Sequence, residues 1–196
     1  KADAEQVSSS LGEEFFTSSL IALGLGMLGI FLYIASRYEM SFAIGGLIAL
    51  AHDVLITIGA VVLFGGELSL IHVGAILTVA GYSVNDTIVV FDRIRENLRS
   101  QRGEVAEVIN GAINATLSRT ILTSLTTIIT VLILSLFGSA ALKDFSVMIL
   151  IGLVVGTFSS MFVAPPVVMW WSRLRGSNLR REMLESTLEP EVRVAR

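Results

Sequence analysis

The chain has 196 residues, of which 53% are hydrophobic and 16% are charged, and its mean hydropathy is +0.76. This apolar composition, with the charges gathered into short segments, excludes an ordinary soluble domain and predicts an all-α, polytopic membrane helix bundle. The chain contains no cysteine, which excludes a disulfide framework, thiol chemistry and a cysteine-ligated metal. The formal net charge of -3 is less informative than the placement of the charges.

Residues 1–10 form a polar leader, and Ser10 and Glu13 fit the capping box that opens a helix. They do not form a signal peptide, because the apolar run that follows is too long for one. Pro165 and Pro166 are expected to break or kink the last apolar run. The predicted transmembrane domain, 15–171, contains five runs of about 20 residues, the length that crosses a hydrocarbon core of roughly 30 Å. These runs are 15–35, 42–64, 70–91, 118–137 and 145–171.

A polar segment, residues 92–117, separates the third and fourth runs. Apolar side chains recur in it at helical spacing, which predicts an amphipathic helix over Glu104–Ala115 near the membrane surface. Residues 172–196 form a charged tail. With the N-terminus outside, every arginine falls on the inside of the membrane, and Lys1 and Lys143 fall outside. The positive-inside rule therefore predicts a cytosolic C-terminus and a cytosolic segment 92–117.

The third run contains the polar pair Asn85 and Asp86 within the stretch Leu77–Asn97. An aspartate in hydrocarbon costs about 2.5–3.5 kcal/mol on translocon scales, so a carboxylate at such a position is typical of a functional site. At 100° per residue, polar side chains share an arc of about 100° on this helix. The arc consists of Thr78, Tyr82, Asn85, Asp86 and Arg93, together with the apolar Val89.

Arg119 opens the fourth run from the same side of the membrane, and its long side chain can reach inward. Polar faces of neighbouring membrane helices pack together because lipid offers no hydrogen-bond partners. We therefore expect an Asp86–Arg119 ion pair that a proton arriving on Asp86 loosens. The alternative is a fixed pair that only joins two helices. The helical face of Arg119 continues as a polar stripe of Thr123, Thr126, Thr127 and Thr130.

His52 and Asp53 lie near the middle of the second run. Adjacent helical residues point about 100° apart, so the two side chains cannot both face one cavity. Either Asp53 is a second proton-relay site supported by His52, or hydrogen bonds between helices satisfy the pair. A metal site is excluded, because the only other histidine, His72, lies at the opposite membrane face and a metal needs more ligands.

Glycines within the apolar runs predict close helix packing, since no Lys-Ser or Lys-Thr follows them as in a phosphate-binding loop. They are Gly24, Gly26, Gly29, Gly45, Gly46, Gly74, Gly81, Gly152 and Gly156. The stretch Ser83–Asp86 fits neither the aspartate nor the serine motif of an intramembrane protease. No aromatic residues are interleaved with the arginines of the tail, so nucleic-acid binding is not indicated. We expect no enzymatic activity, no cofactor and no metal, and we expect membrane lipid as the surroundings.

Five stretches of the sequence resemble, in order, the SecF family of protein-export membrane subunits. The resemblance covers residues 10–175, and the Asn85-Asp86 and Ser118-Arg119-Thr120 motifs are its most specific parts. The matching stretches are Arg37–Glu39 before an Ala-Ile-Gly-Gly helix, Ala49–Thr57 with His52-Asp53, Leu77–Asn97, Asn114–Thr127 and Gly152–Pro166.

The resemblance implies a place in the resistance-nodulation-division superfamily, where SecF and SecD form a pseudo-symmetric twelve-helix unit beside the SecYEG channel. It implies that the proton gradient helps to draw unfolded protein across the bacterial inner membrane, and that Asp86 and Arg119 belong to the proton path. The family pattern has a first helix and a large periplasmic domain that this chain lacks, so residues 1–14 would end the periplasmic stalk.

Several points stay open on this resemblance. They are whether SecD is fused upstream in the same polypeptide, whether sodium replaces the proton as the coupling ion, and which role His52 and Asp53 have. The alternative functions are a proton-coupled exporter of small solutes from the same superfamily, and a structural assembly subunit without proton transport.

Overall fold

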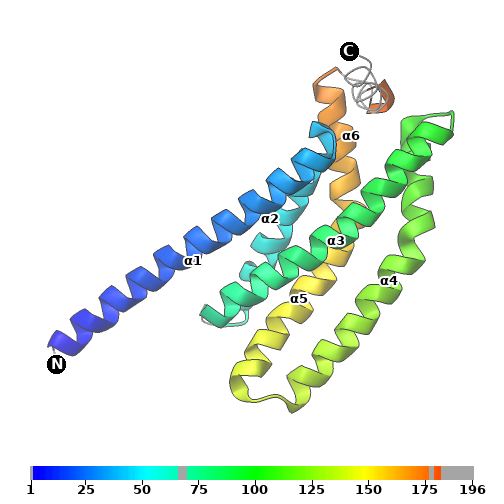
Figure 1. The fold of residues 1–196 in the computed structure, drawn as a ribbon. Helices are drawn as coiled ribbons and strands as arrows, with labels where there is room; N and C mark the ends of the chain where they lie inside the picture. Colours follow the sequence, from blue (N-terminus) through cyan, green and yellow to red (C-terminus); the bar gives the residue numbers. More distant parts are fainter. Residues whose placement is uncertain (1, 66–69, 177–178, 182–196) are drawn as a thin grey trace.

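The computed structural model describes residues 2–65, 70–176 and 179–181, and the side chains of 17–65, 71–176 and 179–181. These residues form helices and no strand, and the helices make an elongated bundle whose N-terminal and C-terminal parts lie at opposite ends (Figure 1). The helices are α1 (Ala2–Arg37), α2 (Met40–Leu63), α3 (Leu70–Ser100), α4 (Val105–Phe137), α5 (Ala140–Phe162) and α6 (Ala164–Leu174).

Five stretches of the described residues are long and apolar enough to cross a membrane, and α5 with α6 makes the last of them. The predicted all-α bundle with five membrane-spanning helices is therefore confirmed. The stretches are Thr17–Arg37, Met40–Leu63, Ile71–Ser100, Val105–Phe137 and Ala140–Leu174.

The boundaries of the predicted elements differ in three places. The first helix begins at Ala2, so Ser10 lies inside α1 and does not open it. The third helix continues past the predicted end to Ser100. The amphipathic stretch Glu104–Ala115 is not a separate helix, since α4 runs without interruption from Val105 to Phe137. Backbone hydrogen bonding continues through these junctions because no proline stands there to remove an N–H donor.

Small residues let the central helices approach each other closely. A Cβ atom built on Gly152 of α5 would lie 2.5 Å from Cγ1 of Val79 on α3, and one built on Gly45 of α2 would overlap Val168 of α6. These glycines confirm the predicted role in close helix packing. They hold α5 against α3 and α6 against α2, and so bring three helices together around the middle of α2.

The break between α5 and α6 follows from two prolines. Pro165 and Pro166 follow Ala164 in the first turn of α6, and they have no N–H to donate to the carbonyls of Met161 and Phe162. Continuous α-helical hydrogen bonding therefore stops at Val163, as the sequence predicts. The two helices either side of Val163 pack on different partners, α5 chiefly on α3 and α4, and α6 chiefly on α2.

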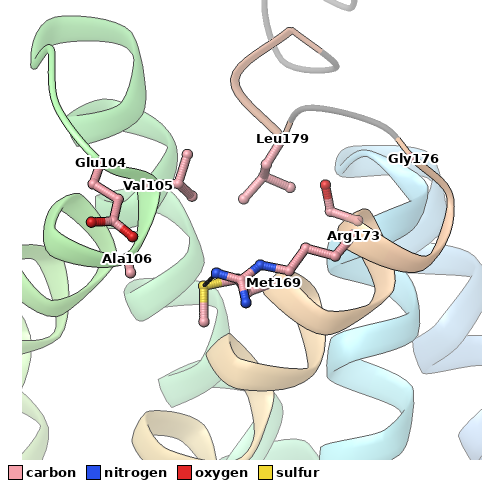
Figure 2. Close-up of a pocket in the computed structure, with 8 residues that line it drawn as sticks. Glu104, Val105, Ala106, Met169, Arg173, Gly176 and Leu179 are labelled. Atoms are coloured by element: carbon pink, nitrogen blue, oxygen red, sulfur yellow. Dashed lines mark hydrogen bonds between the residues drawn. The ribbon is translucent and has the colours of Figure 1, made fainter.

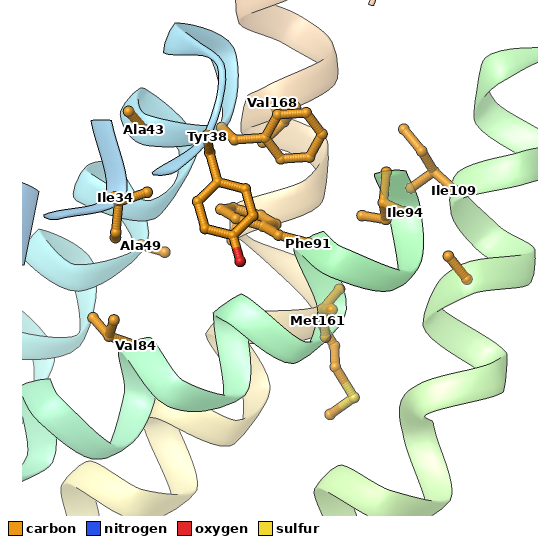
Figure 3. Packing of buried hydrophobic residues seen from close by; sticks show 14 of the residues in the cluster. Ile34, Tyr38, Ala43, Ala49, Val84, Phe91, Ile94, Ile109, Met161 and Val168 are labelled. Carbon is orange, nitrogen blue, oxygen red and sulfur yellow. The ribbon is translucent and has the colours of Figure 1, made fainter. Parts of the chain in front are cut away.

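A hydrophobic cluster fills the end of the bundle that carries most of the described arginines, the arginine-rich end. Figure 3 shows Tyr38 and Phe91 packed beside each other within this cluster. The rings of Phe42 and Phe91 meet edge to face, with 5.0 Å between centroids and 76° between their planes. Aromatic pairs of this geometry contribute about 0.5–1.5 kcal/mol beyond the area that they bury.

Two polar contacts fasten the corner between α1 and α2 to α3. The Tyr38 hydroxyl donates to Oδ1 of Asp92 at 2.9 Å, and Nη2 of Arg95 donates to Oε1 of Glu39 at 3.0 Å. The guanidinium of Arg95 also lies 5.0 Å from the centre of the Tyr38 ring. This end of the bundle is therefore held by side chains that connect three helices.

Burial and the hydrogen bond to Asp92 raise the pKa of the Tyr38 phenol above its usual range. Since folding raises this pKa, the stabilisation is complete below the unfolded value of about 10 and is lost as the pH rises further. We expect Tyr38→Phe to lower the melting temperature of the detergent-purified protein at pH 8, and the difference from wild type to shrink above pH 10. Tyr33→Phe, at an exposed tyrosine, is the control. A difference that is the same at both pH values would contradict the assignment.

Residues after α6 return to the start of α4. Leu179 is buried in the hydrophobic cluster, and Nη2 of Arg180 donates to the carbonyl of Gln101 at 2.9 Å. A cleft of about 330 Å³ lies between Leu179, the start of α4 and the end of α6 (Figure 2). Within the predicted tail 172–196, residues up to 174 belong to α6, and 177–178 and 182–196 lie outside the described residues.

Candidate functional site

Asp53 lies at the meeting point of α2, α3 and α5, and its side chain is fully buried. Its Oδ2 atom accepts hydrogen bonds from Ser83 on α3 and from Ser159 on α5, the latter at 2.7 Å. Gly156 of α5 makes this possible, because a Cβ atom there would lie 2.9 Å from Cβ of Ser83. A carboxylate buried in an apolar bundle is costly unless it is hydrogen-bonded, and two hydroxyl donors meet that requirement.

His52 lies beside Asp53 and is half-buried. Its Nδ1 atom is 3.0 Å from Oδ1 of Asp53, so the two neighbours interact directly although their Cα–Cβ directions diverge. Hydrogen bonds between helices, one of the two alternatives for Asp53, are formed by Ser83 and Ser159. His52 gives Asp53 a third contact. A second relay role for Asp53 is compatible with this geometry and is not decided by it.

We expect Ser159→Ala to destabilise the protein by about 1.5–3 kcal/mol, the usual range for a hydrogen bond to a charged group. The reason is that Asp53 loses one of its donors at a position where its side chain is fully buried. The neighbouring Ser160→Ala is the matched control, because Ser160 is equally buried but donates to the carbonyl of Thr157. Thermal unfolding of the two variants in detergent measures the difference, and equal melting temperatures would contradict it.

Asp86 lies one turn further along α3 than Ser83 and faces α4. Its side chain is 4% exposed, and it accepts a hydrogen bond from the hydroxyl of Ser124, 3.3 Å from Oδ2. The hydroxyl of Thr157 on α5 lies 2.7 Å from that of Ser124. A line of hydroxyl groups therefore runs from Asp86 across α4 to α5.

The expected Asp86–Arg119 ion pair is not formed in this structure. Arg119 is exposed, and it lies where α4 passes Asp92 and Glu96 of α3, in a cleft that Asp86 does not line. The residue of α4 at the level of Asp86 is Ser124, five residues or about 7.5 Å from Arg119 along the helix. The long side chain of Arg119 remains at the arginine-rich end and does not extend along the helix to Asp86.

The predicted polar stripe of α4 does not face α3. Thr123, Thr126 and Thr130 are exposed, and each donates to a carbonyl of its own helix. Thr127 is the exception, because its hydroxyl also lies 3.4 Å from that of Tyr82.

On α3, Asn85 and Thr78 are exposed as well, and Thr78 donates to the carbonyl of Gly74. The structure thus brings Asp86, Tyr82 and Thr127 to the contact between α3 and α4, and leaves Asn85, Arg119, Thr78, Thr123 and Thr126 on the outside of the chain.

Four hydroxyl residues that the sequence did not single out contact the two carboxylates or extend their network. A signal was available for two of them, since Ser83 stands one turn before Asp86, and the spacing of Thr116, Thr120 and Ser124 marks one face of α4. They are Ser83, Ser124, Thr157 and Ser159.

The site consists of two buried carboxylates on neighbouring helices, about one turn apart in depth and surrounded by hydroxyl groups. Among the described residues, no group of three His, Cys, Asp or Glu side chains is placed to hold a metal ion. Ionisable residues within membrane spans are rare and usually mark an ion or proton pathway. Fold and site together define a multi-pass membrane protein with carboxylates at the centre of its helix bundle.

Comparison with known proteins agrees with this class. Residues 1–174 match the family described as protein export membrane protein SecD/SecF, C-terminal. The chain therefore belongs to the SecD/SecF family.

Three relatives show the extent of the match. Protein translocase subunit SecF of Koribacter versatilis is 44% identical over 175 residues, which cover 89% of this chain and 43% of that protein. SecF of Helicobacter pylori is 44% identical over 166 residues, 84% of this chain and 51% of that protein. Protein translocase subunit SecDF of Thermus thermophilus is 43% identical over 173 residues, 88% of this chain and 24% of that protein.

The fold also matches the crystal structure of SecDF, a translocon-associated membrane protein, from Thermus thermophilus. The TM-score is 0.80 at 43% identity, over 84% of this chain and 23% of that chain. The chain spans about half the length of the curated SecF proteins that it matches.

Proposed function

We propose that the chain is the membrane part of a SecF-like subunit that uses the proton-motive force to assist protein translocation. The observation that carries the proposal is Asp86, a buried carboxylate inside an apolar helix with a single hydroxyl partner and no ion-pair partner among the described residues. A carboxylate held by a single hydrogen bond can bind and release a proton without breaking an ion pair. The proposed activity is transport and involves no enzymatic catalysis.

The distribution of charge supports an orientation in the bacterial inner membrane. The ends of α1, α3 and α6 and the start of α4 meet at the arginine-rich end, whereas Lys143 lies at the start of α5 at the other end (Figure 1). By the positive-inside rule, the arginine-rich end, where α6 ends, faces the cytosol, and the start of α1 faces the periplasm.

A second membrane subunit is proposed to cover the outer face of α3 and α4. Asn85 is exposed on this chain alone, in the middle of α3, and lipid would leave its amide group without a partner. The relative named SecDF supports SecD as the occupant, which would complete a pseudo-symmetric twelve-helix unit. SecYEG and the unfolded protein in transit are the further partners that this proposal requires.

The energy available from protons is sufficient for such a role. Moving one charge through 100 mV yields about 2.3 kcal/mol. At about 1.4 kcal/mol per factor of ten, this biases two conformations by roughly 50-fold. One proton per cycle is therefore enough to drive a change of conformation without a nucleotide.

The test uses inverted inner-membrane vesicles that contain the full-length protein with SecD and SecYEG. We expect late-stage translocation of a secretory protein to be faster with a proton gradient than without one, and this stimulation to be absent from vesicles that lack the full-length protein. Replacement of the proton gradient by a sodium gradient identifies the coupling ion. Equal stimulation with and without the protein would overturn the proposal.

A further inference from the structure

Thr120 behaves differently from every other threonine of α4. The hydroxyls of the other five each donate to a carbonyl of their own helix, which is the usual way to satisfy a threonine inside a membrane helix. The hydroxyl of Thr120 has no hydrogen-bond partner in the described part of the chain, and the residue is 1% exposed. A buried hydroxyl without a partner is disfavoured, and a bound water molecule would satisfy it.

Thr120 stands between the open end of the bundle and Asp86. A cleft of about 420 Å³ opens between α3 and α4 at the arginine-rich end, and Thr116 and Val89 line it. On α4, Thr116, Thr120 and Ser124 follow at intervals of four residues, about 6 Å each, within an arc of about 80°. Ser124 is the residue that contacts Asp86. The same helical face therefore leads from the cleft, through Thr120, to the carboxylate.

The charged groups of this region are confined to the mouth of the cleft. They are Asp92, Arg93, Glu96 and Arg119. Arg93 and Glu96 pair with each other at 2.7 Å, and Asp92 accepts from Tyr38. Beyond the mouth, the side chains of α4 on the path to Asp86 are hydroxyls, which accept and donate a proton without a change in their own charge.

We propose that this cleft is the aqueous entrance to Asp86, and that the Thr120 hydroxyl holds the water molecule that connects the two. The inference rests on the proposed function in taking Asp86 as the group that exchanges protons. A proton enters at one side of the water held by Thr120, and another leaves it toward Ser124 and the Asp86 carboxylate. The hydroxyls return to their original state after each transfer, so the net result is one proton moved.

Cysteine labelling tests the entrance without any measurement of transport. The 196 residues contain no cysteine, so single variants are made in the full-length protein after any cysteines elsewhere have been replaced. A small, water-soluble methanethiosulfonate is added to inner-membrane vesicles on the arginine-rich side. Thr120→Cys is compared with Ile121→Cys, the neighbouring residue, which is exposed on the apolar outside of the bundle.

We expect Thr120→Cys to react at least about 10-fold faster than Ile121→Cys, because the thiolate that attacks the reagent forms only where water reaches it. Equal rates would overturn the entrance. This result is independent of the translocation assay, so the entrance and the proposed function can fail separately.

Thr120→Val and Thr120→Ser supply a second measurement. Valine has the shape of threonine and cannot hold the water, so we expect gradient-driven translocation to fall at least about 10-fold, whereas the serine variant retains the wild-type rate. A wild-type rate for Thr120→Val, in vesicles whose wild-type protein responds to the gradient, would overturn the role of Thr120.

Discussion

Asp86→Asn is expected to abolish the gradient-dependent part of translocation. The amide has nearly the same shape as the carboxylic acid and can still accept the hydrogen bond from Ser124, but it does not bind or release a proton in the accessible pH range. At a potential of about 100 mV, the loss amounts to roughly 50-fold if one charge crosses per cycle. The rate without a gradient is expected to remain unchanged. The measurement is late-stage translocation in vesicles that contain the full-length variant and SecD.

Two controls separate proton exchange from a structural role. Asp144→Asn removes a carboxylate at an exposed position near the start of α5 and is expected to leave the gradient response intact. Asp86→Glu retains a titratable group and is expected to restore part of the response. Stimulation by the gradient that survives in Asp86→Asn would show that the carboxylate only joins helices, and would direct attention to Asp53.

Gly152→Ala is expected to destabilise the bundle strongly, although it adds only one methyl group. The new Cβ would lie 2.5 Å from Cγ1 and 3.0 Å from Cβ of Val79, which is itself buried. A valine in a helix has essentially one side-chain rotamer, so Val79 cannot turn aside and α5 must shift away from α3. Overpacking of this kind costs about 1–3 kcal/mol, and the shift also loosens the contacts that Ser83 and Ser159 make with Asp53.

Gly59→Ala is the matched control for this prediction. Gly59 lies on α2, where an added Cβ would have no other atom within 4 Å, so the helix gains about 0.5–1 kcal/mol from the replacement. The melting temperatures of both variants, purified in detergent, are expected to move in opposite directions. The double variant Gly152→Ala, Val79→Ala is expected to recover most of the loss. A Gly152→Ala protein as stable as wild type would contradict the close packing of α3 on α5.

The five membrane spans were predictable because length and hydropathy determine them, and the break at Pro165 and Pro166 was predictable because proline lacks an N–H. The orientation of each helix about its own axis was not. Hydropathy separates an inward from an outward face only when one of them meets water, and lipid is as apolar as the bundle interior. The sequence therefore identified Asp86 as a site residue. It predicted that the face of α4 with Thr123 packs against α3, whereas in the structure the face with Ser124 does so.

The same reasoning applies to individual residues of the site. A periodic pattern places Arg119 and Asp86 near the same side of the membrane, but the register of α3 against α4 decides which residues meet. In the structure Asp86 accepts a hydrogen bond from Ser124. Arg119 instead lies beside Asp92, in the same cleft between α3 and α4. The burial of Asp53 was within reach of the sequence, since an aspartate in an apolar run must find donors. Its donors, Ser83 and Ser159, lie far away along the chain and needed the fold.

The interruption at Val163 has a mechanical consequence. Gly152 gives α5 its tightest contact with α3, whereas Gly45 gives α6 its tightest contact with α2. The peptide units around Val163 form a joint between these pairs, since the prolines have removed the hydrogen bonds that would stiffen it. Sliding of α2 past α3 would be taken up at this joint, while every helix stays straight and both glycines keep their neighbours. Asp53, on α2, accepts hydrogen bonds from serines of α3 and α5, so such sliding would have to break at least one of these two bonds.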